Sequence, residues 1–118
     1  MITELGKELR KIRIDREERL LDMAERLEKS AAFISAVEIG KKSPPSGFEE
    51  SVIKAYSLAS DFAEKIRQAA DRARKAFLLE PNTDLGKDTA GLLARRMNSL
   101  SEDQLKNIQE ILSGKKGS

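Results

Sequence analysis

The apolar side chains between residues 20 and 42 form two short runs at helical spacing, with Lys29 and Ser30 between them. The two runs consist of Met23, Ala24, Leu27, Phe33, Ile34 and Val37. Ser30 is placed to cap the second run by accepting a hydrogen bond from a free backbone N–H. Gly40 follows the last run, where a left-handed cap favours glycine. This pattern predicts two short helices joined by a tight turn.

The rest of the chain carries thin apolar stripes between charged residues, which make up 36% of the sequence. Two prolines within residues 41–47 mark a turn, because proline lacks a backbone donor and disfavours helix before it. We therefore expect a mainly α protein whose first helices cover about residues 3–16, 20–28, 31–39, 48–56 and 61–77. Besides the two runs, the inward positions are expected to be Leu5, Leu9, Ile12, Phe48, Val52, Ile53, Tyr56, Phe62, Ile66, Ala69, Ala70, Ala73 and Phe77.

A proline, an asparagine and a glycine within residues 81–86 mark a second break, after which two more amphipathic helices are expected. Asp88 is a candidate cap for the first of them. Ser101 and Gln104 have the spacing of a capping box for the other. Gly114 ends that helix and opens a polar tail. Both helices are too short to be stable alone, so their apolar faces need a partner surface.

The composition limits the chemistry available to the chain. It contains no cysteine and no histidine, which removes thiolate metal sites, disulfides and the commonest general base. The sequence has no glycine-rich phosphate loop, and its acidic residues are scattered along helical faces. We expect no enzyme activity, no metal and no cofactor. Short apolar runs and the absence of a signal-peptide core predict a cytoplasmic protein that does not enter a membrane.

The net charge is close to balanced. The chain carries 22 basic and 20 acidic residues, a formal charge of +2, and residues 1–45 hold ten basic against nine acidic residues. Basic side chains nevertheless cluster on the first helix, at Lys7, Arg10, Lys11, Arg13, Arg16 and Arg19. Such a stripe is typical of phosphate contacts, but it is equally compatible with a solvated face of i,i+4 ion pairs. The sequence leaves both interpretations open.

The two-helix motif, with GKELRKIRIDRE leading into it, resembles the helix-turn-helix of the lambda-repressor/Cro-like family, also called the XRE family. The resemblance covers about two thirds of the chain. It implies a compact five-helix bundle whose third helix lies in the DNA major groove, followed here by a small helical extension. It also implies a partly buried ion pair between Arg13 and Glu38, at positions where the family has an arginine and a glutamate. The alternative is an ordinary helical bundle without DNA affinity.

The resemblance also assigns candidate DNA contacts. The residues expected to face the bases are Ser30, Ala31, Ala32, Ser35 and Ala36, and those expected near phosphates are Arg19, Lys29, Lys41 and Lys42. Three of the five base-facing residues are alanine, and Leu20 stands where family members often have glutamine. Because alanine offers only a methyl group and serine discriminates little, we expect weak direct readout, with specificity from DNA shape and dimer spacing. A site kept only for protein contact is the alternative.

The function implied is that of a sequence-specific transcriptional regulator that binds a double-stranded DNA operator as a homodimer, most simply a repressor. The alternative is a DNA-binding antitoxin whose residues 77–112 cover a toxin. We expect a DNA-binding domain over residues 1–80 and a dimerisation or partner-binding segment over residues 81–118. The dimer is favoured because helix-turn-helix proteins usually read two half-sites. Its expected interface residues are Leu92, Leu93, Met97, Leu105, Ile108 and Leu112.

Overall fold

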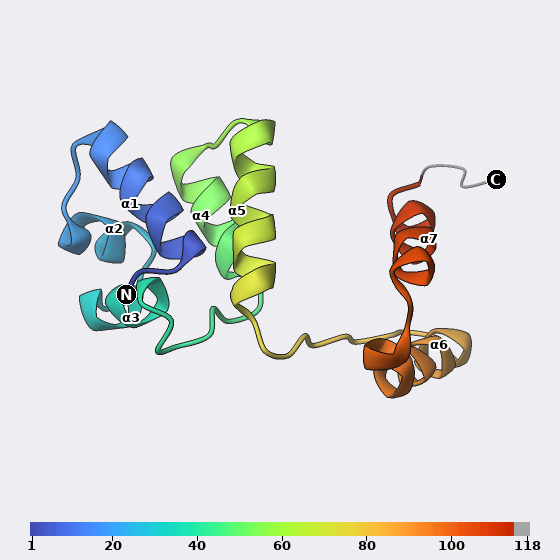
Figure 1. The fold of residues 1–118 in the computed structure, drawn as a ribbon. Helices are drawn as coiled ribbons and strands as arrows, with labels where there is room; N and C mark the ends of the chain where they lie inside the picture. Colours follow the sequence, from blue (N-terminus) through green and yellow to red (C-terminus); the bar gives the residue numbers. More distant parts are fainter. Residues whose placement is uncertain (115–118) are drawn as a thin grey trace. The chain divides into compact units, whose positions relative to one another are not determined.

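The computed structural model describes residues 1–114, which form helices and connecting turns without a β-strand. The chain divides into two compact units, Met1–Leu78 and Leu79–Ser118. The first unit contains α1 (Glu4–Arg16), α2 (Leu20–Arg26), α3 (Ala31–Glu38), α4 (Phe48–Tyr56) and α5 (Ser60–Ala73) (Figure 1). The second contains α6 (Asp84–Arg96), a 3-10 turn at Met97–Ser99 and α7 (Glu102–Leu112).

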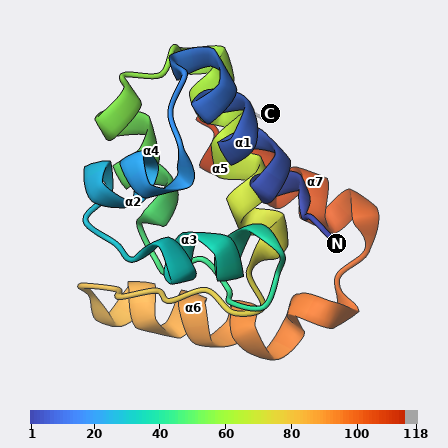
Figure 2. The same ribbon diagram turned by 90° about the vertical axis from the view of Figure 1, so that its left-hand side faces the viewer.

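The first unit has one apolar core, to which all five of its helices contribute. In Figure 2, α1 runs alongside α5, and the two helices are in contact. The fully buried side chains of largest volume are Tyr56, Leu5, Leu9, Met23, Ile34, Ile66, Val37 and Val52. All eight are positions that helical periodicity predicts to be inward, because one stripe of each amphipathic helix must be removed from water. Phe33, Ile53 and Phe62 are only partly buried against this core.

The expected end of the fifth helix, at residue 77, is wrong. Helix α5 ends at Ala73, and Arg74 has extended backbone angles of φ −85° and ψ 140°. Phe77, expected inside, is 60% exposed. Arg74 leaves the helix because its guanidinium donates hydrogen bonds to the backbone oxygens of Pro44 and Pro45, so a tertiary contact overrides the local pattern. Helix α2 also ends two residues before its expected limit, and Glu28 has a positive φ of 57°.

The second unit begins differently from expectation. Thr83, not Asp88, caps α6, and its hydroxyl accepts a hydrogen bond from the backbone N–H of Gly86 at 2.9 Å. Asp88 therefore lies inside the helix. The capping box of α7 is present: the N–H of Gln104 donates to the Ser101 hydroxyl, and the Ser101 N–H donates to the Gln104 side chain. Neither α6 nor α7 contains a buried residue.

Two further expectations concern the chain as a whole. The polar tail expected from Gly114 to the C-terminus lies, apart from Gly114 itself, outside the described residues. Within residues 1–114, no helix combines the length and the apolar character needed to cross a membrane.

Candidate nucleic-acid interface

Helices α2 and α3 pack against each other and are joined by a turn over residues 27–30. Ser30 caps α3, and its Oγ accepts a hydrogen bond from the backbone N–H of Phe33 at 3.0 Å. The turn is tight because Glu28 adopts the left-handed conformation. After α3, Gly40 has a φ of 80°, which allows the chain to reverse toward the proline-containing loop. The two short helices joined by a tight turn are thus present as predicted, with local capping at both ends of α3.

The outward face of α3 is small and nearly uncharged. Ser30 and Ala32 are exposed, whereas Ala31, Ser35 and Ala36 are half-buried. These five side chains offer two hydroxyl groups and three methyl groups. Such a surface permits close approach of a groove wall, but it has no side chain capable of a bidentate hydrogen bond with a base.

Three lysines lie beside this face. The Nζ atoms of Lys29 and Lys42 lie 5.3 and 5.6 Å from the centroid of the Phe33 ring, within cation–π distance. Lys41 is exposed, and its backbone N–H donates to the oxygen of Ala36. Lys29 precedes α3 and the other two follow it, so positive charge is present at both ends of the small-residue face.

Arg19 is at the N-cap position of α2, and its side chain is 79% exposed. Its backbone N–H donates to the Asp22 carboxylate at 2.8 Å, and its Nε lies 3.4 Å from the same oxygen. These contacts lower the pKa of Asp22, with the backbone hydrogen bond as the larger cause. The carboxylate offsets part of the positive charge that Arg19 would otherwise present to a phosphate.

The orientation of α3 is fixed by contacts with α1. Arg13 donates to both carboxylate oxygens of Glu38, at 2.5 and 3.3 Å, and the two side chains are only 11% and 4% exposed. Arg10 adds a third contact, because its Nε lies 3.6 Å from the same carboxylate. The backbone oxygen of Glu38 also accepts hydrogen bonds from the N–H and hydroxyl of Thr3. Glu38 is therefore tied to α1 through both its side chain and its backbone.

The basic stripe of α1 is largely used inside the first unit. Arg10 and Arg13 bind Glu38, and Lys11 lies 3.3 Å from the Glu8 carboxylate. Arg16 donates to a backbone oxygen of α4 at 2.6 Å. Most of these partners lie on other helices, so the contacts match neither interpretation of the sequence in full, and they reduce the positive charge left for phosphates.

A second cluster holds α2 against α4. The Tyr56 hydroxyl donates to the Glu18 carboxylate at 2.7 Å, and Arg26 forms an ion pair with the same carboxylate. The Arg26 guanidinium also lies 4.7 Å from the Tyr56 ring centroid. Burial, together with the hydrogen bond to Glu18, raises the pKa of Tyr56 to about 12. The hydrogen bonds from Arg26 and Tyr56 lower the pKa of Glu18. Both ends of α2 are thereby attached to the core of the unit.

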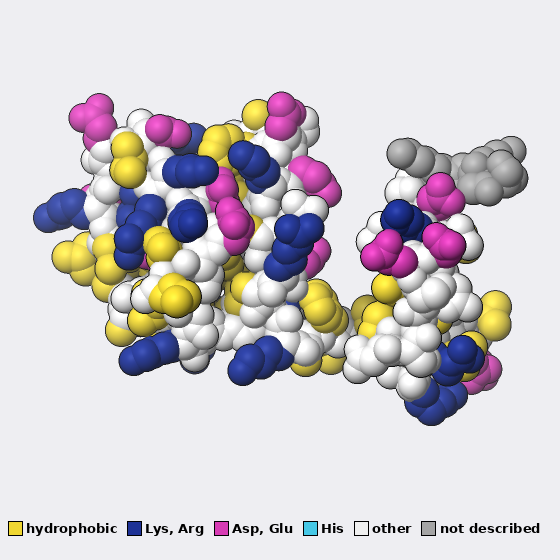
Figure 3. All heavy atoms as spheres, in the orientation of Figure 1, with side chains coloured by type: hydrophobic (Ala, Val, Ile, Leu, Met, Phe, Trp, Pro, Cys, Tyr) yellow, Lys and Arg dark blue, Asp and Glu magenta, His cyan; other side chains and the backbone are white. Residues whose placement is uncertain are grey.

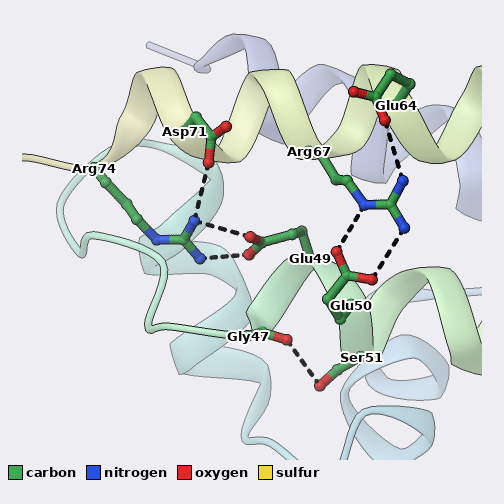
Figure 4. Close-up of polar contacts among 8 residues, drawn as sticks. All are labelled: Gly47, Glu49, Glu50, Ser51, Glu64, Arg67, Asp71 and Arg74. Carbon is green, nitrogen blue, oxygen red and sulfur yellow. Dashed lines mark hydrogen bonds and ion pairs between the residues drawn. The ribbon is translucent and has the colours of Figure 1, made fainter. Parts of the chain in front are cut away.

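Arg74 holds the loop that follows the candidate interface. Its guanidinium binds both carboxylate oxygens of Glu49 (Figure 4). It also donates to the backbone oxygens of Pro44 and Pro45, at 3.0 and 2.7 Å. The side chains of Arg74 and Glu49 are 7% and 13% exposed. Burial by itself would raise the pKa of Glu49, but the hydrogen bonds from Arg74 and from the backbone outweigh it, and the pKa is lowered. We refer to these contacts as the Arg74 clamp.

Several of these positioning residues were not predicted from the sequence. The two hydrogen bonds from Thr3 to the Glu38 oxygen have no signal in the sequence, and Arg10 was expected only as part of the basic stripe. The Arg74 clamp has no local signal, because its partners are 25 or more residues away. Gly6 is a further positioning residue, because a Cβ atom there would collide with the backbone oxygen of Glu38. It does have a local signal, since an isolated glycine inside a helical pattern is unfavourable unless another backbone approaches it closely.

The electrostatic character of the first unit is mixed. Figure 3 shows Lys and Arg side chains interspersed with carboxylates over its visible face, rather than one continuous basic field. No group of three or more potential metal-ligating side chains occurs in the part of the chain that the structure describes. The candidate interface is thus a small neutral helix face with lysines at its two ends. No known family, curated protein or solved structure matches this chain.

Proposed function

We propose that the protein is a transcriptional regulator of the lambda-repressor-like type, a repressor that binds duplex DNA as a homodimer. The observation that carries the proposal is the α3 face: small side chains flanked by Lys29, Lys41 and Lys42, on a helix that Glu38 ties to α1. In the proposed complex α3 enters the major groove. The lysines neutralise phosphates on either side of it.

The chemistry of the face determines the kind of recognition. Alanine methyl groups contact thymine methyl groups, and the two serine hydroxyls hydrogen-bond with almost any base edge. Most of the affinity then comes from phosphate contacts and from the use of two half-sites. We expect a pseudo-palindromic operator with half-sites about one helical turn apart, and modest discrimination between sequences within each half-site.

Fluorescence anisotropy with the duplex upstream of the protein's own gene, at several salt concentrations, tests the proposal. Affinity is expected to fall steeply as salt rises, because each lysine–phosphate contact releases counterions. Lys42→Ala should weaken binding to all sequences alike and reduce the salt slope by about 1. Lys54→Ala, which removes the same charge from an exposed position on α4, is the matched control and should leave the slope unchanged.

A second pair of variants tests α3 itself. Ala32→Glu should abolish binding, because it places a carboxylate against the groove, while circular dichroism remains native. Ala59→Glu introduces the same charge at an exposed position before α5 and should bind DNA normally. Absence of binding at low salt, or normal binding by a natively folded Ala32→Glu protein, would overturn the proposal.

A further inference from the structure

The second unit carries an apolar groove of about 460 Å³ between α6 and α7. The apolar side chains that line it are Leu92, Leu93, Leu100, Ile108, Ile111 and Leu112. Four of the six residues expected at a dimer interface are among them, whereas Met97 and Leu105 do not line the groove. The apolar residues near the end of α7 are the most open to solvent, with Ile111 72% and Leu112 78% exposed.

Helices α6 and α7 need a packing partner for the apolar side chains that line the groove. They are 13 and 11 residues long, and neither contains a buried residue. Helices of this length are marginal in water unless an apolar face is packed. The five helices of the first unit, by contrast, bury an apolar core of their own.

We propose that α7 of a second copy of this chain occupies the groove and lies antiparallel to α6 in a two-fold symmetric dimer. The inference rests on the proposed function in that it supplies the interface of the DNA-binding dimer. By symmetry each copy inserts its own α7 into the groove of the other.

The charges on the two helices select this pairing. Helix α6 carries three basic residues and two acidic ones, a net charge of +1, whereas α7 carries three acidic residues and one basic one, a net charge of −2. A dimer in which α7 contacts only α7 of the other copy brings like charges together. Contact between α6 and α7 brings opposite charges together and satisfies both copies at once.

The ends of the helices define the direction. The last turn of α6 carries Arg95 and Arg96, and the first turn of α7 carries Glu102 and Asp103. An antiparallel arrangement places these two pairs opposite each other and also opposes the helix dipoles. All ion pairs among residues 1–114 lie in the first unit, so none of these four charges has an ion-pair partner among the described residues of its own copy.

Reciprocal charge reversal in the full-length chain tests the proposal. One protein carries Arg95→Glu with Arg96→Glu, and the other carries Glu102→Arg with Asp103→Arg. Alone, each should dimerise about a hundredfold more weakly than the wild type, because like charges then face each other twice. An equimolar mixture should form a heterodimer, since both contacts again join opposite charges. A chain with all four changes should return to a homodimer.

The measurement is sedimentation velocity with one protein labelled, accompanied by circular dichroism. Both variants place an unfavourable charge at a helix end, but loss of helix would not be reversed by mixing, so recovery in the mixture identifies the contact. The matched control is Arg72→Glu with Lys75→Glu, at exposed positions of the first unit, which should remain dimeric.

Three results would overturn the proposal: a monomeric wild type, variants that dimerise normally, or a mixture that does not recover. A monomeric wild type would indicate that a different protein occupies the groove. Failure of the interface is distinguishable from failure of the proposed function, because binding to a single half-site depends on α3 and is measured on the same variants. Dimerisation without DNA binding would support the proposed interface and contradict the proposed regulatory function.

Discussion

A Cβ atom at Gly6 would lie 2.3 Å from the backbone oxygen of Glu38 and 2.7 Å from Cγ1 of Ile2. The same Glu38 oxygen accepts hydrogen bonds from the N–H and hydroxyl of Thr3, at 2.9 and 3.0 Å. Gly6 permits the close approach of α1 to the end of α3, and the two hydrogen bonds from Thr3 hold the helices at that distance. These two residues, with the ion pair of Glu38, set the position from which α3 is presented.

At this scale we predict that Gly6→Ala lowers the free energy of unfolding by about 1–3 kcal/mol, although alanine is the better helix former. The added methyl group must push α1 away from a backbone atom that cannot rotate aside. Denaturant unfolding followed by the fluorescence of Tyr56, the only tyrosine in a chain without tryptophan, measures the change.

Gly91→Ala in α6 is the matched control. The nearest atom outside its own surroundings is Nη1 of Arg95 at 3.5 Å, an ordinary contact, so the Tyr56 transition should not move. An unchanged or increased stability of the Gly6→Ala protein would show that the close approach has no structural consequence.

At the scale of elements, one set of contacts fixes both the end of α5 and the loop before α4. The Arg74 clamp stops α5 at Ala73 and holds the loop that carries the chain from α3 to α4. Beside it, Arg67 binds Glu50 with similar geometry, at 2.7 and 3.1 Å, but those side chains are 41% and 55% exposed (Figure 4). The two pairs differ chiefly in burial.

We predict that Glu49→Gln lowers the free energy of unfolding at neutral pH by about 3 kcal/mol, because it leaves a buried guanidinium without its counter-charge. Glu50→Gln makes the same chemical change in the exposed pair and should cost less than about 1 kcal/mol. Chemical denaturation of both variants provides the comparison. Equal costs would show that burial does not distinguish the two pairs.

The pH dependence follows from the same pair. Since the pKa of Glu49 is lower in the folded protein than its ordinary value of 4.5, its contribution is complete above that value. The contribution is lost as the pH falls through the folded-state pKa. The stabilities of the wild type and of Glu49→Gln should therefore converge in acid, and a constant difference down to pH 2 would contradict the assignment.

At the scale of the whole molecule, the two units differ in how completely they satisfy their own apolar surface. The first buries a core that includes Leu5, Ile34, Tyr56 and Ile66 at 1% exposure or less. The second buries no residue in either helix. We therefore expect the first unit to fold alone and the second to need a partner surface.

We predict that a chain ending at Glu80 unfolds cooperatively with the same Tyr56 transition as the full-length protein. It should be monomeric by light scattering and bind a single half-site with unchanged affinity. Its affinity for the complete operator should fall by at least about a hundredfold, because the two half-sites are then bound independently. A truncated chain that remains dimeric would place the interface in the first unit.

The sequence by itself determined the elements and much of the candidate site. Apolar residues at helical spacing predicted the five helices of the first unit, and Ser30, Gly40 and the Ser101 capping box act locally, as their patterns indicated. Capping and amphipathicity depend on neighbours within about four residues, so a linear pattern contains them. The position of Arg13 relative to Glu38 came instead from a family resemblance, and the structure joins the two side chains.

Only the tertiary structure decided where α5 ends, which arginines of α1 are bound internally, and why Gly6 is glycine. Each of these depends on a partner 25 or more residues away in the chain: Arg74 on the proline loop, Arg10 and Gly6 on Glu38, and Arg16 on Tyr56. Phe77 shows the same limit, because its helical spacing predicted burial but the helix stops before it. Burial and ion pairing depend on distances in space, and those are set when the helices pack.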